Sequence, residues 1–77
     1  MYYVYILKLD DSYYSGSTPD LRRRFQEHLN KAAKSTKKSK SIKLVFYAAF
    51  VSKITALRFE KYLKSSSGFA FRNKRLI

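Results

Sequence analysis

The absence of cysteine from a chain of 77 residues is the feature that most limits how this protein can fold. It excludes a disulfide scaffold, a thiolate zinc site and a cysteine nucleophile. A chain of this length buries only about 60% of the surface that its unfolded form exposes, so it supports one small core. Apolar residues make up 45% of the sequence, which argues against disorder. We therefore expect a single domain over residues 1–77.

The net charge predicts the kind of partner. The chain has 17 Lys and Arg against 5 Asp and Glu, a formal net charge of +12. Such an excess favours nucleic acid as the partner, over an anionic membrane surface or no polyanion at all. Many of the lysines lie between residues 31 and 43, where no hydrophobic periodicity appears. This stretch is either a loop that contacts phosphates or a solvated connector.

No segment has the length expected of a membrane span. The longest continuous apolar run covers residues 44–51, whereas a transmembrane helix needs about 20 residues. The apolar N-terminal segment lacks a basic region before it and is short for a signal peptide. We expect a soluble, cytoplasmic protein.

The first half of the chain predicts a hairpin followed by a helix. Aromatic and β-branched residues predict a strand over residues 2–8, and a turn signal leads to a second strand over 13–15, which Gly16 ends. Thr18 is the expected cap of a helix that runs to about residue 33, because a proline and an acid follow it.

The second half predicts one more strand and two helices. The apolar run over residues 44–50 is typical of a buried strand. A helix over about 53–64 follows, with Ser52 or Thr55 at its start. The serine–glycine segment after it breaks the helix, and residues 69–77 form a short basic helix. The fold class is therefore α/β (α+β): a small three-stranded antiparallel sheet flanked by helices, in the order β-β-α-β-α-(α).

Several polar side chains are placed where they could form a site. Arg24 and His28 lie one helical turn apart, at one edge of the apolar stripe of the first predicted helix. Glu60 lies near the apolar arc of its own helix, and a carboxylate there needs Arg, Lys or a metal as a partner. The predicted hairpin carries several tyrosines, Tyr5 and Tyr14 among them, and one pair of these could complete the site. The single histidine excludes a multi-histidine metal cluster within one chain.

Each of these residues also has a purely structural interpretation. On that interpretation Tyr5 and Tyr14 are ordinary sheet residues, since tyrosine is common in strands. Arg24 is then a surface cation or the partner of Glu60. His28 is a helix-edge residue without a chemical role, and Glu60 is the acid of a structural ion pair.

The order and spacing of these residues resemble the GIY-YIG nucleases. Tyr3-Val4-Tyr5 stands at the family's first motif and Tyr14-Ser15-Gly16 at its second, with Tyr in place of Gly in the first and Ser in place of Ile in the second. Arg24 and His28 follow the first residue of the second motif by ten and fourteen residues, as they do in the family.

The similarity covers almost the whole chain. The Ala-Leu-x-x-Glu-Lys helix looks similar to the family's and places Glu60 on its catalytic glutamate. Residues 62–71 resemble small stand-alone bacterial members of the family, which are often described as excinuclease-like. The family's late active-site asparagine has no assigned counterpart, although Asn73 is nearby.

The resemblance implies hydrolysis of nucleic-acid phosphodiester bonds with one divalent metal, Mg²⁺ or Mn²⁺, held by Glu60. Arg24 would bind the scissile phosphate, because its planar fork matches two oxygens. Tyr5 would act as general base toward water or orient it, and Tyr14 would orient water or phosphate. His28 would accept a proton from Tyr5 or bind phosphate.

We therefore expect a metal-dependent endonuclease, with DNA favoured over RNA and with repair or recombination intermediates as candidate substrates. The alternative is a non-catalytic nucleic-acid-binding module with a decayed site. A third hypothesis is a nuclease that takes its specificity from a protein partner. The cations expected to contact nucleic acid are Arg22, Arg23, Lys37, Lys38, Lys40, Lys64, Arg72 and Lys74.

Overall fold

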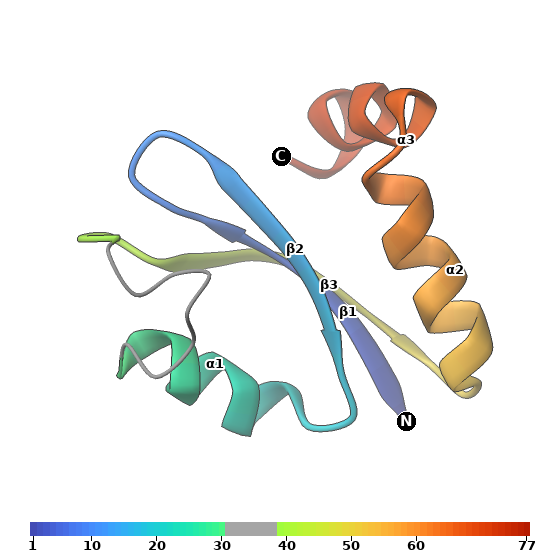
Figure 1. Ribbon diagram of the computed structural model, residues 1–77, viewed down its shortest axis with the longest axis horizontal. Coiled ribbons are helices and arrows are strands. Elements are labelled where there is room, and N and C mark those ends of the chain that lie inside the picture. Colours follow the sequence, from blue (N-terminus) through green and yellow to red (C-terminus); the bar gives the residue numbers. More distant parts are fainter. Residues whose placement is uncertain (31–38) are drawn as a thin grey trace.

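The computed structural model describes residues 1–30 and 39–77, and it contains the predicted three-stranded antiparallel sheet (Figure 1). The strands are β1 (Tyr2–Lys8), β2 (Tyr13–Thr18) and β3 (Lys43–Phe50), in the spatial order β2-β1-β3. Both neighbours of β1 run antiparallel to it. The α+β fold class predicted from the sequence is confirmed. Strands β2 and β3 are the outer strands of the sheet.

The hairpin of β1 and β2 is longer than the sequence predicted. Its turn is closed by the backbone N–H of Leu9, which donates to the carbonyl of Ser12 at 2.8 Å. Strand β2 continues through Gly16 to Thr18, where the sequence predicted it to end at Gly16. Gly16 pairs with Tyr5 in the register, so the glycine is an internal residue of the strand.

Helix α1 (Leu21–Leu29) begins two residues later than predicted, because Asp20 is its cap. The Asp20 carboxylate accepts a hydrogen bond from the backbone N–H of Arg23 at 3.1 Å. Thr18 instead accepts from the N–H of Asp20 at 3.1 Å, which shapes the entry into the helix. The expected end of the helix near residue 33, and most of the lysine-rich stretch, lie outside the described residues.

The two faces of the sheet are covered differently. Val4 and Ile6 form the core with Ala56 and Leu63 of helix α2 (Lys53–Leu63), and all four are at most 1% exposed. On the other face α1 has few close contacts with any one strand. The apolar core therefore lies between the sheet and α2, and the α1 side is looser.

Strand β3 is not the buried strand that its apolar run suggested. Its residues alternate between exposed and half-buried, and Tyr47 is 56% exposed. The physical reason is its place at the edge of the sheet, with Phe46 and Phe50 directed toward α2 and the alternate residues toward the looser face. A bulge shifts its register between Ile6 and Leu7.

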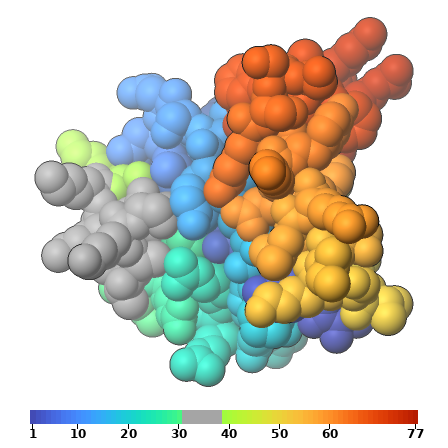
Figure 2. Space-filling model, turned by 45° about the vertical axis from the view of Figure 1, so that its right-hand side comes forward, coloured from blue at the N-terminus to red at the C-terminus, as the bar shows by residue number. Residues whose placement is uncertain are grey.

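The helix breaks near the serine–glycine segment, as predicted, but the next helix begins at Ser66 and not at residue 69. Ser52 caps α2, and Ser65 caps helix α3 (Ser66–Phe71) by accepting from the N–H of Gly68 at 3.2 Å. A Cβ on Gly68 would collide with the carbonyl oxygen of Tyr62, so only glycine allows this close approach. A π-helical segment η2 (Arg72–Leu76) completes the C-terminal part, which packs beside β2 in the space-filling view (Figure 2).

None of the helices within residues 1–30 and 39–77 has the length and apolar character needed to cross a membrane.

Candidate active site

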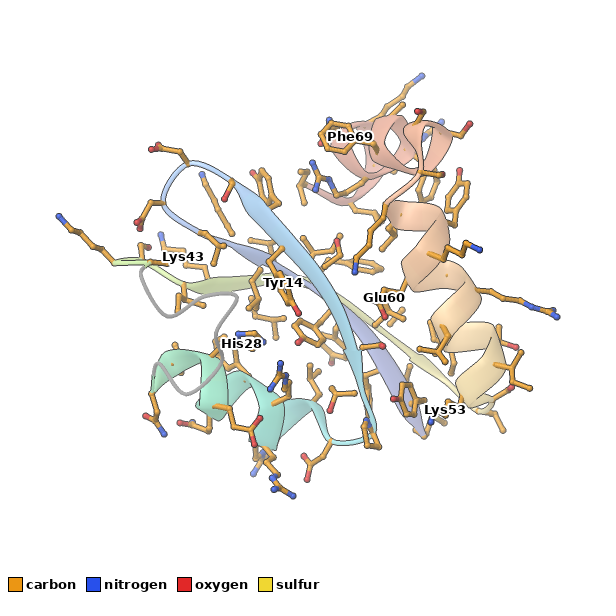
Figure 3. The ribbon with its side chains drawn as sticks, in the orientation of Figure 1. Tyr14, His28, Lys43, Lys53, Glu60 and Phe69 are labelled. Carbon is orange, nitrogen blue, oxygen red and sulfur yellow. The ribbon has the colours of Figure 1, made fainter. Side chains whose placement is uncertain are left out.

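Three aromatic rings gather on the face of β1 and β2 that α1 covers. The phenol oxygen of Tyr5 lies 2.9 Å from Nε2 of His28, within hydrogen-bond distance. The Tyr14 ring lies 6.2 Å from the Tyr5 ring and 5.4 Å from the His28 imidazole, measured between centroids. Tyr5 and His28 are at most 1% exposed. The structure thus brings together three residues that the sequence places on three elements, β1, β2 and α1, and Figure 3 shows Tyr14 and His28 between β2 and α1.

Gly16 makes room for this cluster. A Cβ built on Gly16 would lie 2.6 Å from the Tyr5 oxygen and 3.0 Å from Cε2 of Tyr14. Any larger residue at position 16 would therefore push against both rings. The glycine of the second motif has a steric role that spacing alone did not reveal.

Arg24 stands beside the ring cluster on α1. Its Nη1 donates to Oε1 of Glu27 at 2.9 Å, and its side chain is 34% exposed. The hydrogen bond to Glu27 and the contact with Tyr5 raise the pKa of Arg24, so the guanidinium stays charged. Glu27 was not predicted as a site residue, although its position three residues after Arg24 on one helix is a recognisable signal. Arg24 thus places a positive charge next to the Tyr5 phenol. The side chain is partly exposed, and its hydrogen bond to Glu27 positions it.

Burial and the Arg24 guanidinium determine the protonation states of Tyr5 and His28. Burial raises the pKa of Tyr5 to about 12, and the neighbouring Arg24 opposes this rise. Burial, together with the positive charge of Arg24, lowers the pKa of His28 below its ordinary value of 6.5. At neutral pH the phenol is therefore protonated and the imidazole is neutral. A neutral imidazole has one nitrogen that can accept the phenol proton.

Glu60 lies across strand β2 from the rings. Its Oε1 accepts from the hydroxyl of Ser17 at 2.5 Å, and its Oε2 accepts from Nζ of Lys64 at 2.8 Å. Neighbouring residues of a strand face opposite sides of the sheet, so Gly16 contacts the rings while Ser17 contacts Glu60. Figure 3 shows Tyr14 and Glu60 on either side of β2. The edge strand is thus the element that joins the two parts of the candidate site.

The Glu60 carboxylate is ionised at neutral pH. Burial tends to raise its pKa, but the hydrogen bonds from Lys64 and Ser17 outweigh this effect and lower it. Among the described residues no group of three or more His, Cys, Asp or Glu could enclose a metal ion. One ionised carboxylate fits Mg²⁺, which keeps several waters and takes phosphate oxygens as further ligands. Glu60 is therefore the residue that would hold a divalent metal, after displacement of Lys64.

The cations predicted to contact nucleic acid lie in different settings. Arg22 and Arg23 are exposed on α1, and Lys74 is exposed on η2. Lys40 is exposed, and its backbone N–H donates to the Asp10 carboxylate at 3.0 Å. Lys37 and Lys38 lie outside the described residues.

Arg72 differs from the exposed position expected of a cation on a nucleic-acid surface. It is only 7% exposed, because its guanidinium lies against two aromatic rings. Sequence reasoning could not distinguish it from the exposed cations nearby.

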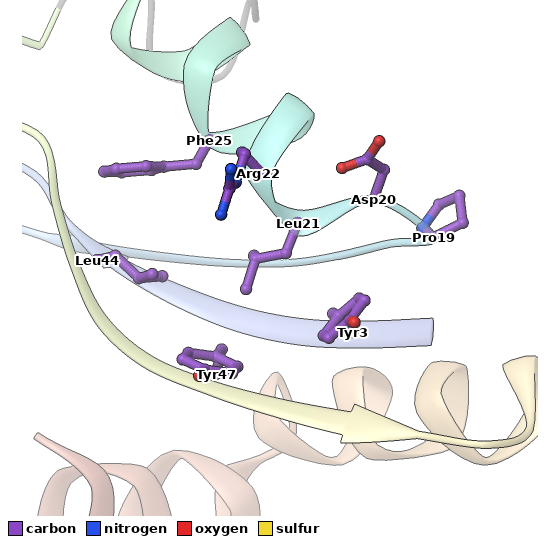
Figure 4. A pocket seen from close by; sticks show the side chains of 8 residues that line it. All are labelled: Tyr3, Pro19, Asp20, Leu21, Arg22, Phe25, Leu44 and Tyr47. Atoms are coloured by element: carbon purple, nitrogen blue, oxygen red, sulfur yellow. The ribbon is translucent and has the colours of Figure 1, made fainter. Parts of the chain in front are cut away.

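A hollow of about 490 Å³ opens between α1 and the sheet (Figure 4). Tyr3 of β1 and Tyr47 of β3 line it on the sheet side, and Leu21 and Phe25 line it on the α1 side. Arg22 lies at its side. This hollow reflects the loose packing of α1 on the sheet.

The fold and this arrangement define a class of protein: a small α+β domain with tyrosine, arginine and histidine on one side of an edge strand and a glutamate on the other. The GIY-YIG catalytic domain matches residues 1–75. The chain therefore belongs to the GIY-YIG nuclease superfamily, in its branch of small bacterial proteins.

Individual relatives support the same assignment. A UPF0213 protein of Cupriavidus necator is 41% identical over 68 residues, which cover 86% of this chain and 74% of that protein. A UPF0213 protein of Streptococcus pneumoniae is 42% identical over 64 residues, covering 80% of this chain and 65% of that protein. The solution NMR structure of a UPF0213 protein from Bacillus halodurans matches with a TM-score of 0.60 and 36% identity, over 97% of this chain and 85% of that chain.

Proposed function

We propose that this protein is a metal-dependent endonuclease that hydrolyses phosphodiester bonds in nucleic acid, with DNA favoured over RNA. The observation that carries the proposal is the buried hydrogen bond between Tyr5 and His28 beside the Arg24 guanidinium. A tyrosine with a proton acceptor behind it and a fixed cation beside it has the parts needed to activate water next to a phosphate. Family membership supports the same chemistry.

Tyr5 and His28 would move the proton. A phenol with a pKa of about 12 is a poor base alone, because little of it is ionised near neutral pH. If Tyr5 passes its proton to the neutral His28 as it takes one from water, no free phenolate has to form. The Nε2 atom of His28 lies 2.9 Å from the Tyr5 oxygen, so the role of proton acceptor is favoured over direct contact with phosphate.

Arg24 and Tyr14 would position the substrate. The Arg24 side chain is 34% exposed, so its guanidinium can reach a phosphate from solvent. A guanidinium binds two phosphate oxygens at once, which orients the scissile group as well as attracting it. Tyr14 packs against both Tyr5 and His28 and would orient the water or the phosphate at the edge of the cluster.

Glu60 would hold the divalent metal, Mg²⁺ or Mn²⁺. A bound divalent ion supplies stabilisation of negative charge on the leaving oxygen. Ser17 fixes one oxygen of the carboxylate, and the lowered pKa of Glu60 keeps it ionised. The substrates we propose are branched or nicked intermediates of DNA repair or recombination in the cytoplasm, with a protein partner as a source of specificity.

Cleavage assays with matched variants test this proposal. Labelled branched, nicked, duplex and single-stranded DNA and RNA are incubated with Mn²⁺ or with EDTA, using wild type, Glu60→Gln and Asp11→Asn. Asp11 is an exposed acid in the hairpin turn, so its variant controls for the loss of one negative charge. We expect metal-dependent cleavage by wild type and Asp11→Asn, and none by Glu60→Gln. Cleavage by Glu60→Gln at the wild-type rate would refute the proposed metal site.

A non-catalytic nucleic-acid-binding module is the second candidate, and one contact favours it. Nζ of Lys64 donates to Oε2 of Glu60, so a metal held by this carboxylate would have to displace the lysine. If this ion pair is permanent, no cleavage occurs with any metal, and binding depends on salt but not on Mg²⁺ beyond screening.

A further inference from the structure

Arg72 is a buried cation for which the described residues supply no carboxylate. The centre of its guanidinium lies 4.2 Å from the Phe69 ring centroid and 5.0 Å from that of Tyr13. Its Nε and Nη2 donate to Oδ1 of Asn73 at 3.2 and 3.0 Å. Burial of a charge is costly unless an opposite charge or several hydrogen bonds compensate. A neutral amide and two ring faces compensate only in part, so this position favours an anion.

The remaining donors of Arg72 border an open pocket. An arginine has more N–H donors than the two that Asn73 engages. The pocket has a volume of about 420 Å³, and Arg72, Lys64 and Ser15 supply its polar side chains. The rest of its lining is Tyr13, Tyr14, Leu63 and Phe69, so it holds no acidic residue. Two cations and a hydroxyl group around one hollow form a setting for a phosphate group.

This pocket adjoins the candidate active site. Tyr14 lines the pocket and also packs in the ring cluster with Tyr5 and His28. Lys64 lines the pocket and donates to Glu60 at 2.8 Å. In the space-filling view the C-terminal helices, orange to red, stand directly beside β2, in blue (Figure 2). A nucleic-acid strand whose scissile phosphate lies at Arg24 and Glu60 would therefore pass this pocket.

We propose that the pocket binds a second phosphate of the nucleic-acid strand, a neighbour of the scissile one. Arg72 donates to this phosphate through the N–H groups that Asn73 does not engage, and the positive charge of Lys64 adds to the attraction. The two ring faces hold the guanidinium in a fixed plane, so this contact sets the register of the strand. The identity of the ligand as a nucleic-acid strand rests on the proposed function.

The test measures binding without cleavage. Fluorescence polarisation follows a labelled octamer of thymidylate in EDTA at several salt concentrations, with wild type, Arg72→Gln, Lys64→Gln and Arg58→Gln. Arg58 is exposed on α2, outside the pocket, and its variant makes the same change of charge. We expect Arg72→Gln and Lys64→Gln each to weaken binding about tenfold, a typical loss for a charge-assisted contact. Arg72→Gln should also flatten the slope of log K against log salt by about 0.7, the value for one phosphate on a single strand, and Lys64→Gln by less, because both side chains contact the same phosphate.

A neutral ligand adds a second, independent arm. In an octamer with methylphosphonate linkages the backbone has no charge, so Arg72→Gln should bind it as well as wild type does. Equal losses for Arg58→Gln and Arg72→Gln would overturn the proposal, because the effect would then belong to the general positive field. A submillimolar Kd for inorganic phosphate alone, with no effect of Arg72→Gln on the octamer, would assign the pocket to free phosphate and also overturn it.

Folding and catalysis are kept apart from this test. If circular dichroism shows that Arg72→Gln is unfolded, Lys64→Gln decides, since that side chain is 55% exposed and can be changed without loss of the core. Binding that depends on the pocket, in a wild type that cleaves nothing with metal, would support the phosphate site while the nuclease proposal fails. Cleavage by wild type, with octamer affinity unchanged in both variants, would support the nuclease proposal and overturn the phosphate site.

Discussion

The phenol oxygen of Tyr5 and Nε2 of His28 lie 2.9 Å apart inside the protein, although the two residues are 23 positions apart in the sequence. Strand β1 supplies one and helix α1 the other, so the pair forms only when α1 packs on the hairpin. Because α1 has few other close contacts with the sheet, this hydrogen bond is part of what holds the helix in place. The proposed chemistry and the local stability therefore depend on the same two side chains.

Replacement of Tyr5 by phenylalanine should separate these two effects. The ring remains, while the hydroxyl group and its hydrogen bond to His28 are lost. We expect the free energy of unfolding to fall by about 1 kcal/mol, the net contribution of a typical hydrogen bond. Cleavage should fall by about 10²- to 10⁴-fold, the contribution of a positioned proton acceptor. Single-turnover cleavage and urea unfolding measure the two losses, and wild-type cleavage by Tyr5→Phe would contradict the proposed role.

Gly16→Ala, on strand β2, should also disturb the ring cluster. The new methyl group would lie 2.6 Å from the Tyr5 oxygen, so the ring has to move. We expect a loss of about 1–3 kcal/mol in the free energy of unfolding, as for other overpacked sites, and a strong fall in cleavage.

A double variant checks that the Gly16→Ala effect acts through Tyr5. The combination with Tyr5→Phe removes the atom nearest to the new methyl group. The stability losses should then be less than additive, because one change relieves the strain caused by the other. Strictly additive losses in thermal melts would show that Gly16 matters for another reason.

The sequence predicted the elements well wherever local chemistry determines them. Aromatic and β-branched residues marked β1, and the fold class is confirmed. The helical spacing of Arg24 and His28 placed them on one side of α1, and the family resemblance added Tyr5 and Tyr14. Their catalytic roles remain predictions, because the structure shows only how they lie.

The parts that the sequence did not predict depend on contacts between distant segments. Gly16 signals the end of a strand, but it pairs with Tyr5 inside β2, where the Tyr5 ring leaves no room for a side chain. Gly68 signals a helix break, yet α2 already ends at Leu63 and Gly68 lies inside α3, where the Tyr62 carbonyl leaves no room for a side chain. The Ser17–Glu60 hydrogen bond joins residues 43 positions apart, so no local pattern could indicate it.

Two neighbouring arginines offer a matched test of phosphate binding. Arg23 and Arg24 both pair with Glu27, but the Arg23 side chain is 78% exposed and that of Arg24 lies beside Tyr5. Arg24→Lys keeps the charge and loses the planar fork, so kcat/KM should fall by about 10- to 100-fold. Arg23→Lys should change kcat/KM by less than about twofold, as expected for an exposed ion pair. Equal effects of the two substitutions would contradict a special role for Arg24.

The pH dependence of stability should report the burial of His28. Burial and Arg24 lower its pKa in the folded protein, so the unfolded chain takes up the proton at a higher pH than the folded chain does. Above the unfolded value of about 6.5 the imidazole is neutral in both states and contributes no pH dependence. Below it the free energy of unfolding should decrease until the folded pKa is reached. Glu27 and Glu60 have lowered pKa values, so their stabilisation is lost only at lower pH, as the carboxylates protonate below about 4.3.

Thermal melts of wild type and His28→Gln between about pH 8 and 5 measure this effect in the range where histidine titrates and carboxylates do not. Glutamine keeps a hydrogen-bond acceptor for Tyr5 but cannot titrate. We expect the Tm of wild type to fall as the pH drops below about 6.5, and that of His28→Gln to be lower at neutral pH but nearly constant over the same range. Parallel curves for the two proteins would show that another group carries the pH dependence, and that His28 is protonated as readily in the folded protein as in the unfolded chain.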